Sequence, residues 1–168
     1  MQHGFSLLEL LAVTALLGVL ALAGWPSLQA SMHQQRLLRV AEQLYGEVRD
    51  TRLAAIGGGE DWWFGMSQQG QWCYWQGEQQ PHSCTVQQRA YVSGLTAQHV
   101  PAVVVEALFA HVPAARFTAF SGMAGFSSGH FRITHEALSN VELRVIVSSL
   151  GRIRLCTQRG RFSRVPPC

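Results

Sequence analysis

Lysine is missing from this sequence of 168 residues, so all thirteen basic residues are arginine. Charged side chains make up 14% of the chain, and the formal net charge is +3. Five of the arginines follow Gly151 with no acidic residue among them: Arg152, Arg154, Arg159, Arg161 and Arg164. The rest of the chain is therefore slightly acidic. A basic end of this kind is typical of proteins with a polyanionic partner, and is equally common as a solvated terminus.

Motifs that would indicate an enzyme are missing too. The sequence has no HExxH, no GxSxG and no glycine loop that would hold a phosphate before a helix. Its histidines are scattered, and the positions of His130 and His135 differ by five, an odd number, which places them on opposite faces of a strand. The glycines at 57–59 are better explained as the end of a helix. We therefore expect no catalytic residues, no cofactor and no enzymatic activity.

The four cysteines show no CxxC spacing, so a zinc site is not indicated. An even number of cysteines behind an N-terminus that looks like an export signal favours disulfides. Three pairings are possible. We favour Cys73 with Cys84 and Cys156 with Cys168, because each pair closes a short local loop. The alternative is four buried free thiols.

Charge is almost absent from the N-terminal part of the chain. Between Phe5 and Met32 the single charged side chain is Glu9. As a helix, residues 5–28 would measure about 36 Å, which is enough to cross a hydrocarbon core of about 30 Å. An ordinary cleaved secretory signal is not indicated, because basic residues before the run and small residues at a cleavage point after it are missing. We predict a transmembrane helix over residues 5–28.

The same helix is expected to continue. Pro26 removes one backbone hydrogen bond, so we expect a bend near residues 21–22 rather than an end. Residues 29–56 then carry apolar side chains at helical spacing, with charged residues largely on other faces. The apolar positions are Leu37, Ala41, Leu44, Val48 and Ala55. This amphipathic half should pack one side against a globular core and end at the glycines of 57–59.

Residues 57–168 change to short β-type runs that are separated by turns. Residues 61–66 and 71–75 predict a hairpin. Further runs are 103–109, 116–120, 130–134, 141–148 and 152–156. We expect an α+β fold in which a small antiparallel β-sheet domain packs on the long helix. Repeats and low-complexity stretches are absent.

Aromatic side chains crowd the predicted hairpin, namely Trp62, Trp63, Trp72, Tyr74 and Trp75. Side chains alternate along a strand, so adjacent Trp62 and Trp63 cannot both face one core. Cross-strand aromatic pairs are the commoner explanation for such a cluster. Stacking on a partner or on nucleic-acid bases is the alternative.

The N-terminus resembles the processing site of type IV prepilins, because Gly4 precedes Phe5 and an apolar run, and Glu9 is the fifth residue after the glycine. The resemblance implies that a prepilin peptidase removes residues 1–4 as a leader peptide and methylates the new amino terminus of Phe5. Pro26 would be the twenty-second residue of the mature chain, where family members commonly carry a helix-bending proline. The leader departs from the usual pattern in lacking lysine and arginine.

Resemblance also implies a pilin-like fold and a single-pass inner-membrane protein. Its globular domain would lie in the periplasm, and the protein could enter an extracellular pilus. The expected partners are other minor and major pilins or pseudopilins, the prepilin peptidase, the inner-membrane assembly platform and membrane lipid. In the assembled fibre, Glu9 would face the amino terminus of Phe5 in a neighbouring subunit. A carboxylate and an amine are oppositely charged at neutral pH, and an apolar bundle strengthens their attraction. We interpret Glu9 as the residue that sets the register of the helices.

The C-terminal part narrows the resemblance. Residues 149–156, SLGRIRLC, are similar to the GRxRxC segment of minor pilins and pseudopilins of the FimT/GspH type. Together with the WC pair at 72–73, Cys84 and the last cysteine, the pattern looks closest to the PpdA group of prepilin-peptidase-dependent proteins. This implies a minor pilin that takes part in initiating or assembling a filament. An H-type pseudopilin of type II secretion is the alternative, and residues 86–140 carry no resemblance.

Arg152 and Arg154 are two residues apart on a predicted strand, so they share one face while Ile153 and Leu155 share the other. Cys156 would join the arginine face unless a bulge intervenes. In some FimT-type minor pilins the equivalent GRxR arginines bind DNA during natural transformation. The resemblance therefore assigns possible DNA contacts to this segment, because the planar fork of arginine can hold two phosphate oxygens. A flexible end carrying Arg159, Arg161 and Arg164 would extend the strip. Alternatively, Arg152 and Arg154 pair with Glu142 or with acids of a neighbouring subunit.

Overall fold

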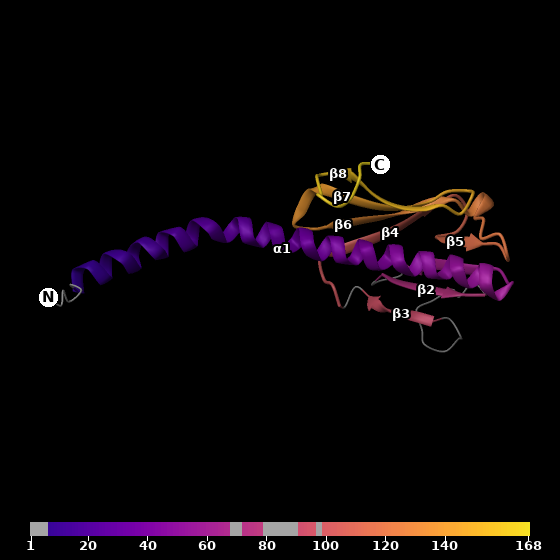
Figure 1. The fold of residues 1–168 in the computed structure, drawn as a ribbon, viewed down its shortest axis with the longest axis horizontal. Coiled ribbons are helices and arrows are strands. Elements are labelled where there is room, and N and C mark those ends of the chain that lie inside the picture. The colour runs from indigo at the N-terminus through magenta and orange to yellow at the C-terminus, as the bar shows by residue number, and fades with distance from the viewer. Residues whose placement is uncertain (1–6, 68–71, 79–90, 97–98) are drawn as a thin grey trace.

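A computed structural model of the chain describes residues 7–67, 72–78, 91–96 and 99–168. Its largest element is helix α1, Leu7–Gly58, which continues through Pro26 and ends at the glycines as expected. The first half of α1 projects away from the globular part and the second half lies along it (Figure 1). No helix among the described residues is both long and apolar enough to count as a membrane span. The transmembrane segment over residues 5–28 stays a prediction, as does the bend near residues 21–22.

The second half of α1 is one-sided, as its sequence pattern indicates. Leu37, Ala41, Leu44 and Val48 are fully or almost fully buried, while Arg39 and other charged residues of this half are exposed. The period of these apolar positions places them on one stripe of the helix. That stripe packs on the β-strands and anchors α1 to the globular part.

In the described part of the chain after α1, eight strands form two antiparallel four-stranded sheets. The first sheet has the order β3-β2-β1-β5, with bounds Tyr91–Thr96, Cys73–Gly77, Trp62–Ser67 and Ala114–Phe117. The second has the order β4-β6-β7-β8, with bounds Val103–Phe109, Gly129–His135, Leu138–Val147 and Ile153–Arg159. A short 3-10 helix, η1, covers Gly125–Ser127. The protein therefore has the expected α+β pilin-like fold.

Two sheets stand where we expected one small sheet. The chain leaves the first sheet after β3, forms β4 at the edge of the second, and returns for β5 at the far edge of the first. Figure 1 shows α1 running along the globular part with β6, β7 and β8 on one side and β2 and β3 on the other. Phe64 of the first sheet meets Phe131 of the second edge to face, with ring centroids 5.4 Å apart. One core thus lies between the helix and both sheets.

The local predictions fare unevenly. The hairpin is confirmed, because β1 pairs antiparallel with β2. Strand β3 was not predicted at all. The run at 116–120 is wrong at its end, because β5 stops at Phe117 and the chain turns at Phe120, whose φ of 59° lies in the left-handed region. A phenylalanine disfavours that conformation, so tertiary contacts overrode the local β preference.

The aromatic residues of the hairpin serve the fold. Trp72, Tyr74 and Trp75 are buried. Tyr74 stacks on Phe64 across β1 and β2, with ring centroids 5.4 Å apart. The ring of Trp75 lies so close to Gly65, its partner on β1, that a Cβ there would be 2.2 Å from it. These cross-strand contacts favour the structural explanation over stacking on a partner.

Candidate functional site

Two regions carry the functional predictions: the start of α1 and the C-terminal strand with its arginines. The processing residues Gly4 and Phe5 lie outside the described residues. Glu9 is exposed in the first turn of α1, where the helix dipole favours a negative charge. No residue that the structure describes forms an ion pair with Glu9.

The start of α1 is apolar on every side. Among the side chains of this segment that the structure describes, twelve large apolar ones are more than half exposed: Leu7, Leu8, Leu10, Leu11, Val13, Leu16, Leu17, Val19, Leu20, Trp25, Leu28 and Met32. Exposed apolar surface of this extent on one element is typical of a membrane or protein interaction site. The isolated chain leaves this surface without a cover.

The arginine segment follows the predicted alternation. Ile153 and Leu155 pack against the core, whereas Arg154 is exposed on the opposite face of β8. Cys156 shares the face of Arg154 and is nevertheless fully buried. Arg152 precedes the strand, and its main-chain N–H donates to Ser148 Oγ at 3.0 Å within the turn between β7 and β8. Arg152 and Arg154 therefore lie close together, as the GRxR spacing requires.

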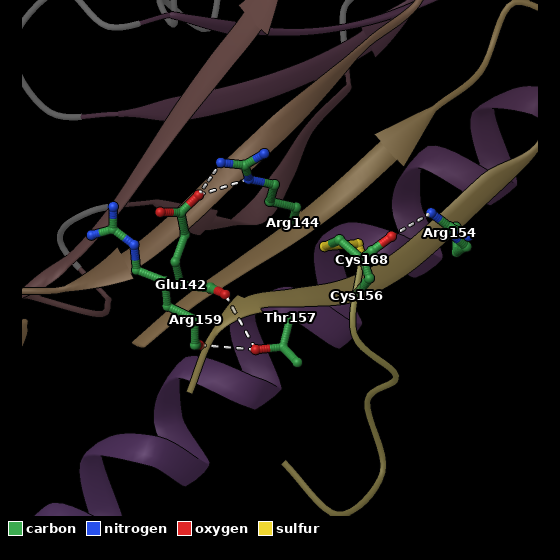
Figure 2. The surroundings of a disulfide bond; sticks show 7 residues. All are labelled: Glu142, Arg144, Arg154, Cys156, Thr157, Arg159 and Cys168. Atoms are coloured by element: carbon green, nitrogen blue, oxygen red, sulfur yellow. Dashed lines mark hydrogen bonds and ion pairs between the residues drawn. A yellow bond between two sulfur atoms is a disulfide. The ribbon is translucent and has the colours of Figure 1, made fainter. Parts of the chain in front are cut away.

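The chain after β8 is not the flexible end that we expected. It turns back and runs parallel to the outer edge of β8, where Thr157 N–H donates to Pro166 O at 2.8 Å and Cys168 N–H donates to Thr157 O at 3.0 Å. A disulfide joins Cys156 to Cys168 (Figure 2). These contacts cover the edge strand, whose unpaired backbone groups would otherwise be open to other chains. They also explain why Cys156 is buried.

The disulfide between Cys156 and Cys168 is one of the two pairings that the sequence favoured. Cys73 is disulfide-bonded as well. Its expected partner, Cys84, lies outside the described residues, so that pairing stays a prediction.

The five C-terminal arginines are all exposed, and none forms an ion pair with a residue in the described part of the chain. Arg154 Nη2 donates to the main-chain oxygen of Cys168 at 3.4 Å. Glu142 pairs instead with Arg144, with Nη2 and Oε1 2.6 Å apart (Figure 2). The suggested pairing of Arg152 or Arg154 with Glu142 is therefore wrong within this chain. Glu142 and Arg144 are two residues apart on β7, so their side chains lie on the same face of one strand.

The five C-terminal arginines are too widely spread to form one patch. Arg152 and Arg159 lie at opposite ends of β8, which separates them by about 23 Å at 3.3 Å per residue. Arg161 and Arg164 follow in the returning segment, beside the bridge between Phe162 and Val165. The five arginines are thus separate cations spread over β8, its two ends and the returning segment, with Arg154 between Arg152 and Arg159.

Residues 1–25 match the family that is described as the prokaryotic N-terminal methylation motif. No curated protein and no solved structure matches the chain. The match supports a type IV pilin-like prepilin. A prepilin-type motif implies processing by a prepilin peptidase, anchoring in the membrane and assembly with other pilins.

One contact in this pilin-like chain carried no signal in the sequence. His33 of α1 meets His135 at the end of β6, with ring centroids 4.6 Å apart. Main-chain N–H of Ala137 donates to His135 Nδ1 at 3.1 Å. Burial lowers the pKa of His135, and the nearby His33 and Arg36 add to the effect. The two histidines are distant in sequence and carry no shared motif, so only the fold reveals that they meet.

Proposed function

We propose that this chain is a minor type IV pilin. It is made as a prepilin, cleaved between Gly4 and Phe5, methylated at Phe5 and held in the inner membrane by residues 5–28 with its globular domain in the periplasm. Its work is to help initiate or assemble a filament with other pilins. The observation that carries the proposal is the prepilin motif at the head of a long helix whose first half is exposed, apolar and outside the globular part.

The physical reason for this proposal is that the exposed apolar surface on the first half of α1 must be shielded from water. A bilayer would cover it before assembly, and the equivalent helices of neighbouring subunits would cover it in a filament. An apolar surface alone packs in many registers. Glu9 selects one of them, since a buried charge is strongly destabilising without its partner. The amino terminus that cleavage creates at Phe5 of a neighbouring subunit is the partner that we propose.

Two measurements test this function. The intact mass of the protein from its own membranes should correspond to a chain that begins at methylated Phe5, and a chain that still begins at Met1 would contradict the proposal. Glu9→Val should be cleaved and kept in the membrane yet enter sheared filaments poorly. Thr14→Val removes another polar side chain from the same exposed segment and should enter filaments normally. Equal incorporation of the two variants would remove the role assigned to Glu9.

An H-type pseudopilin of type II secretion is the alternative within the same class of protein. The support is the likeness of residues 149–156 to the GRxRxC segment of both groups. Deletion of the gene separates the two. Loss of pili with normal protein secretion would support the minor pilin, and the reverse result would support the pseudopilin.

DNA binding by the C-terminal arginines is the second candidate function. The observation that favours it is that Arg152 and Arg154 are exposed, close together and free of ion pairs with the residues that the structure describes. Affinity for duplex DNA should fall steeply as salt rises, because binding to phosphates releases counterions. The double variant Arg152→Gln and Arg154→Gln should weaken binding and reduce the salt dependence. The matched double variant Arg39→Gln and Arg49→Gln, on the exposed side of α1, should bind as the wild type does.

A further inference from the structure

An exposed apolar surface, which we call the tip patch, lies at the end of the globular part that is farthest from the N-terminus. Its members are Phe120, Met123, Phe126 and Leu150, with 77%, 45%, 91% and 72% of their surface exposed. They come from the loop after β5, from η1 and from the turn between β7 and β8. Ser149 O accepts hydrogen bonds from the N–H groups of Ala124 and Gly125, at 3.0 and 2.8 Å, so the loop and the turn lie side by side.

The backbone that presents the tip patch is held by contacts with the end of α1. Phe120 N–H donates to Ala55 O at 3.3 Å, and Arg52 Nε donates to Gly122 O at 3.0 Å. The ring of Phe120 lies against Gly59, because a Cβ there would be 2.8 Å from Cζ of the ring. Phe120 also keeps a left-handed backbone conformation, with φ 59°. Such strain is typical of sites where a side chain is held ready for a partner.

Two arginines border the tip patch. Arg52 lies beside the turn between β7 and β8, since a Cβ on Gly151 would be 3.0 Å from its Nε, and Arg152 follows Gly151 in the chain. Neither arginine forms an ion pair with a residue that the structure describes. Aromatic side chains, methionine and arginine are enriched in protein–protein interfaces over the rest of the protein surface. The tip patch and its border have this composition, so the partner should be a protein whose apolar surface lies beside a carboxylate.

We infer that the tip patch binds the apolar helix of a different pilin-type subunit, one that lies farther from the membrane than this chain does. This inference rests on the proposed function of a minor pilin. The prepilin motif implies assembly with other pilins, which bring helices of the same type. A minor pilin is present in few copies, so the neighbour of each copy is a different chain.

The first half of a pilin-type helix is the surface that suits the tip patch. In this chain, the described side chains of that half are largely apolar and exposed, and residues 25–32 at its end carry no charged side chain. A helix of the same type in another subunit offers an equally apolar surface, and the charged residues that follow its apolar half supply the carboxylate. The membrane that would hold residues 5–28 lies at the other end of the molecule (Figure 1), so lipid does not reach the tip patch.

The dimensions of this chain agree with such a contact when the partner has similar proportions. The globular part lies along α1 from His33, which meets His135, to Gly58, or about 39 Å at 1.5 Å per residue. The tip patch is level with Ala55, and Leu28 precedes Ala55 by about 41 Å on the same scale. A subunit that is shifted by one globular length away from the membrane therefore places the end of its apolar helix half level with the tip patch. Its own globular part then clears this one.

Photo-crosslinking in cells that carry their complete set of pilin genes tests the inference. The full-length chain carries p-benzoylphenylalanine in place of Phe126. After irradiation, sheared filaments should contain a product in which residue 126 is joined to the apolar helix of a different protein that has its own prepilin motif, and mass spectrometry identifies the protein and the linked stretch. The control places the same photoreactive residue at Ser139, which is exposed on β7 about 26 Å from Val147 at 3.3 Å per residue. It should give no product with that stretch.

The outcomes separate the two proposals. If the chain is absent from filaments, the proposed function fails and the inference fails with it. If the chain is present in filaments and residue 126 links to the globular part of another pilin, to a second copy of this chain, to lipid, to a protein without a prepilin motif or to nothing, the inference about the tip patch is overturned and the proposed function stands. The same product from position 139 would also overturn the inference.

A double variant supplies a second test. Phe126→Ser with Leu150→Ser should keep the wild-type melting temperature because both side chains are exposed. It should lower incorporation into filaments about tenfold, which is the loss expected when an interface loses central apolar contacts. The matched pair Leu53→Ser with Leu108→Ser removes two exposed apolar side chains outside the tip patch and should be incorporated as the wild type is. Normal incorporation of the first variant, or equal losses in both, would overturn the inference.

Discussion

The indole Nε1 of Trp72 donates a hydrogen bond to the main-chain oxygen of Val103 at 2.7 Å. Trp72 immediately precedes β2 of the first sheet, and Val103 begins β4 of the second. Both residues are buried. The bond therefore ties the two sheets together inside the shared core, where no water can replace it.

Trp72→Phe should lower the free energy of unfolding by about 1 to 3 kcal/mol, because it leaves a buried carbonyl oxygen without its donor while an aromatic ring remains. Denaturant unfolding of the purified full-length chain measures this. Trp63→Phe is the matched control, since Trp63 is half-buried and stacks with Arg116, whose Cζ lies 5.5 Å from the ring centroid. The control substitution should lower the free energy of unfolding by less than half as much as Trp72→Phe does. An equal loss in both variants would show that the hydrogen bond adds nothing.

Cys168→Ser should lower the melting temperature under oxidising conditions. The disulfide between Cys156 and Cys168 closes a loop with a sequence separation of 12 residues, which contributes on the order of 3 kcal/mol in the chain-entropy model. The effect should disappear when wild type and variant are compared in a reducing agent that opens this bond. A melting curve that is unchanged under oxidising conditions would mean that the returning segment is held without the disulfide.

Gly151→Ala and Gly46→Ala should change stability in opposite directions. Gly151 has φ 75° and a Cβ there would lie 1.9 Å from Gly122 O, so alanine should cost at least about 1 to 3 kcal/mol. Gly46 lies inside α1 with open space around its Cα, so alanine should stabilise the helix by about 0.5 to 1 kcal/mol. Thermal unfolding of the two variants beside the wild type measures both effects. Destabilisation by Gly46→Ala would mean that this glycine is needed for packing.

Stability should fall as the pH is lowered through the ordinary histidine range. Burial lowers the pKa of His135 below its usual 6.5, so the unfolded chain binds a proton more readily than the folded chain. The stability that comes from neutral His135 is therefore fully present above about pH 6.5, and it is lost as the pH falls toward the lowered pKa. Burial lowers the pKa of His130 in the same direction, with Arg144 adding to it.

Melting temperatures between pH 7.5 and 5 check this expectation. His135→Asn cannot take up the proton and offers Oδ1 to the N–H of Ala137, so its melting temperature should change less with pH than that of the wild type. The exposed His111→Asn should follow the wild type. Identical pH dependence in all three proteins would show that His135 does not couple protonation to folding.

The local sequence pattern was sufficient to predict α1. An unbroken apolar run, apolar residues at helical spacing through residue 56 and three glycines predicted a helix that stops at residues 57–59, and α1 ends at Gly58. Backbone hydrogen bonds within a helix depend on nothing more distant. The hairpin of β1 and β2 and the opposite faces of Arg154 and Leu155 followed from the two-residue period of strands in the same way. The prepilin motif is likewise a run of neighbouring residues.

The sequence by itself thus determined the long helix, its apolar start with Glu9, and the alternation along β8. The tertiary structure alone decided that the strands divide into two sheets, that the C-terminal segment returns along β8, that His33 meets His135 and that Phe120 turns outward at the tip. The physical reason is the range of the interactions. Helical periodicity and strand alternation act between near neighbours, whereas strand pairing and burial join residues whose separation in the chain leaves no local pattern to read.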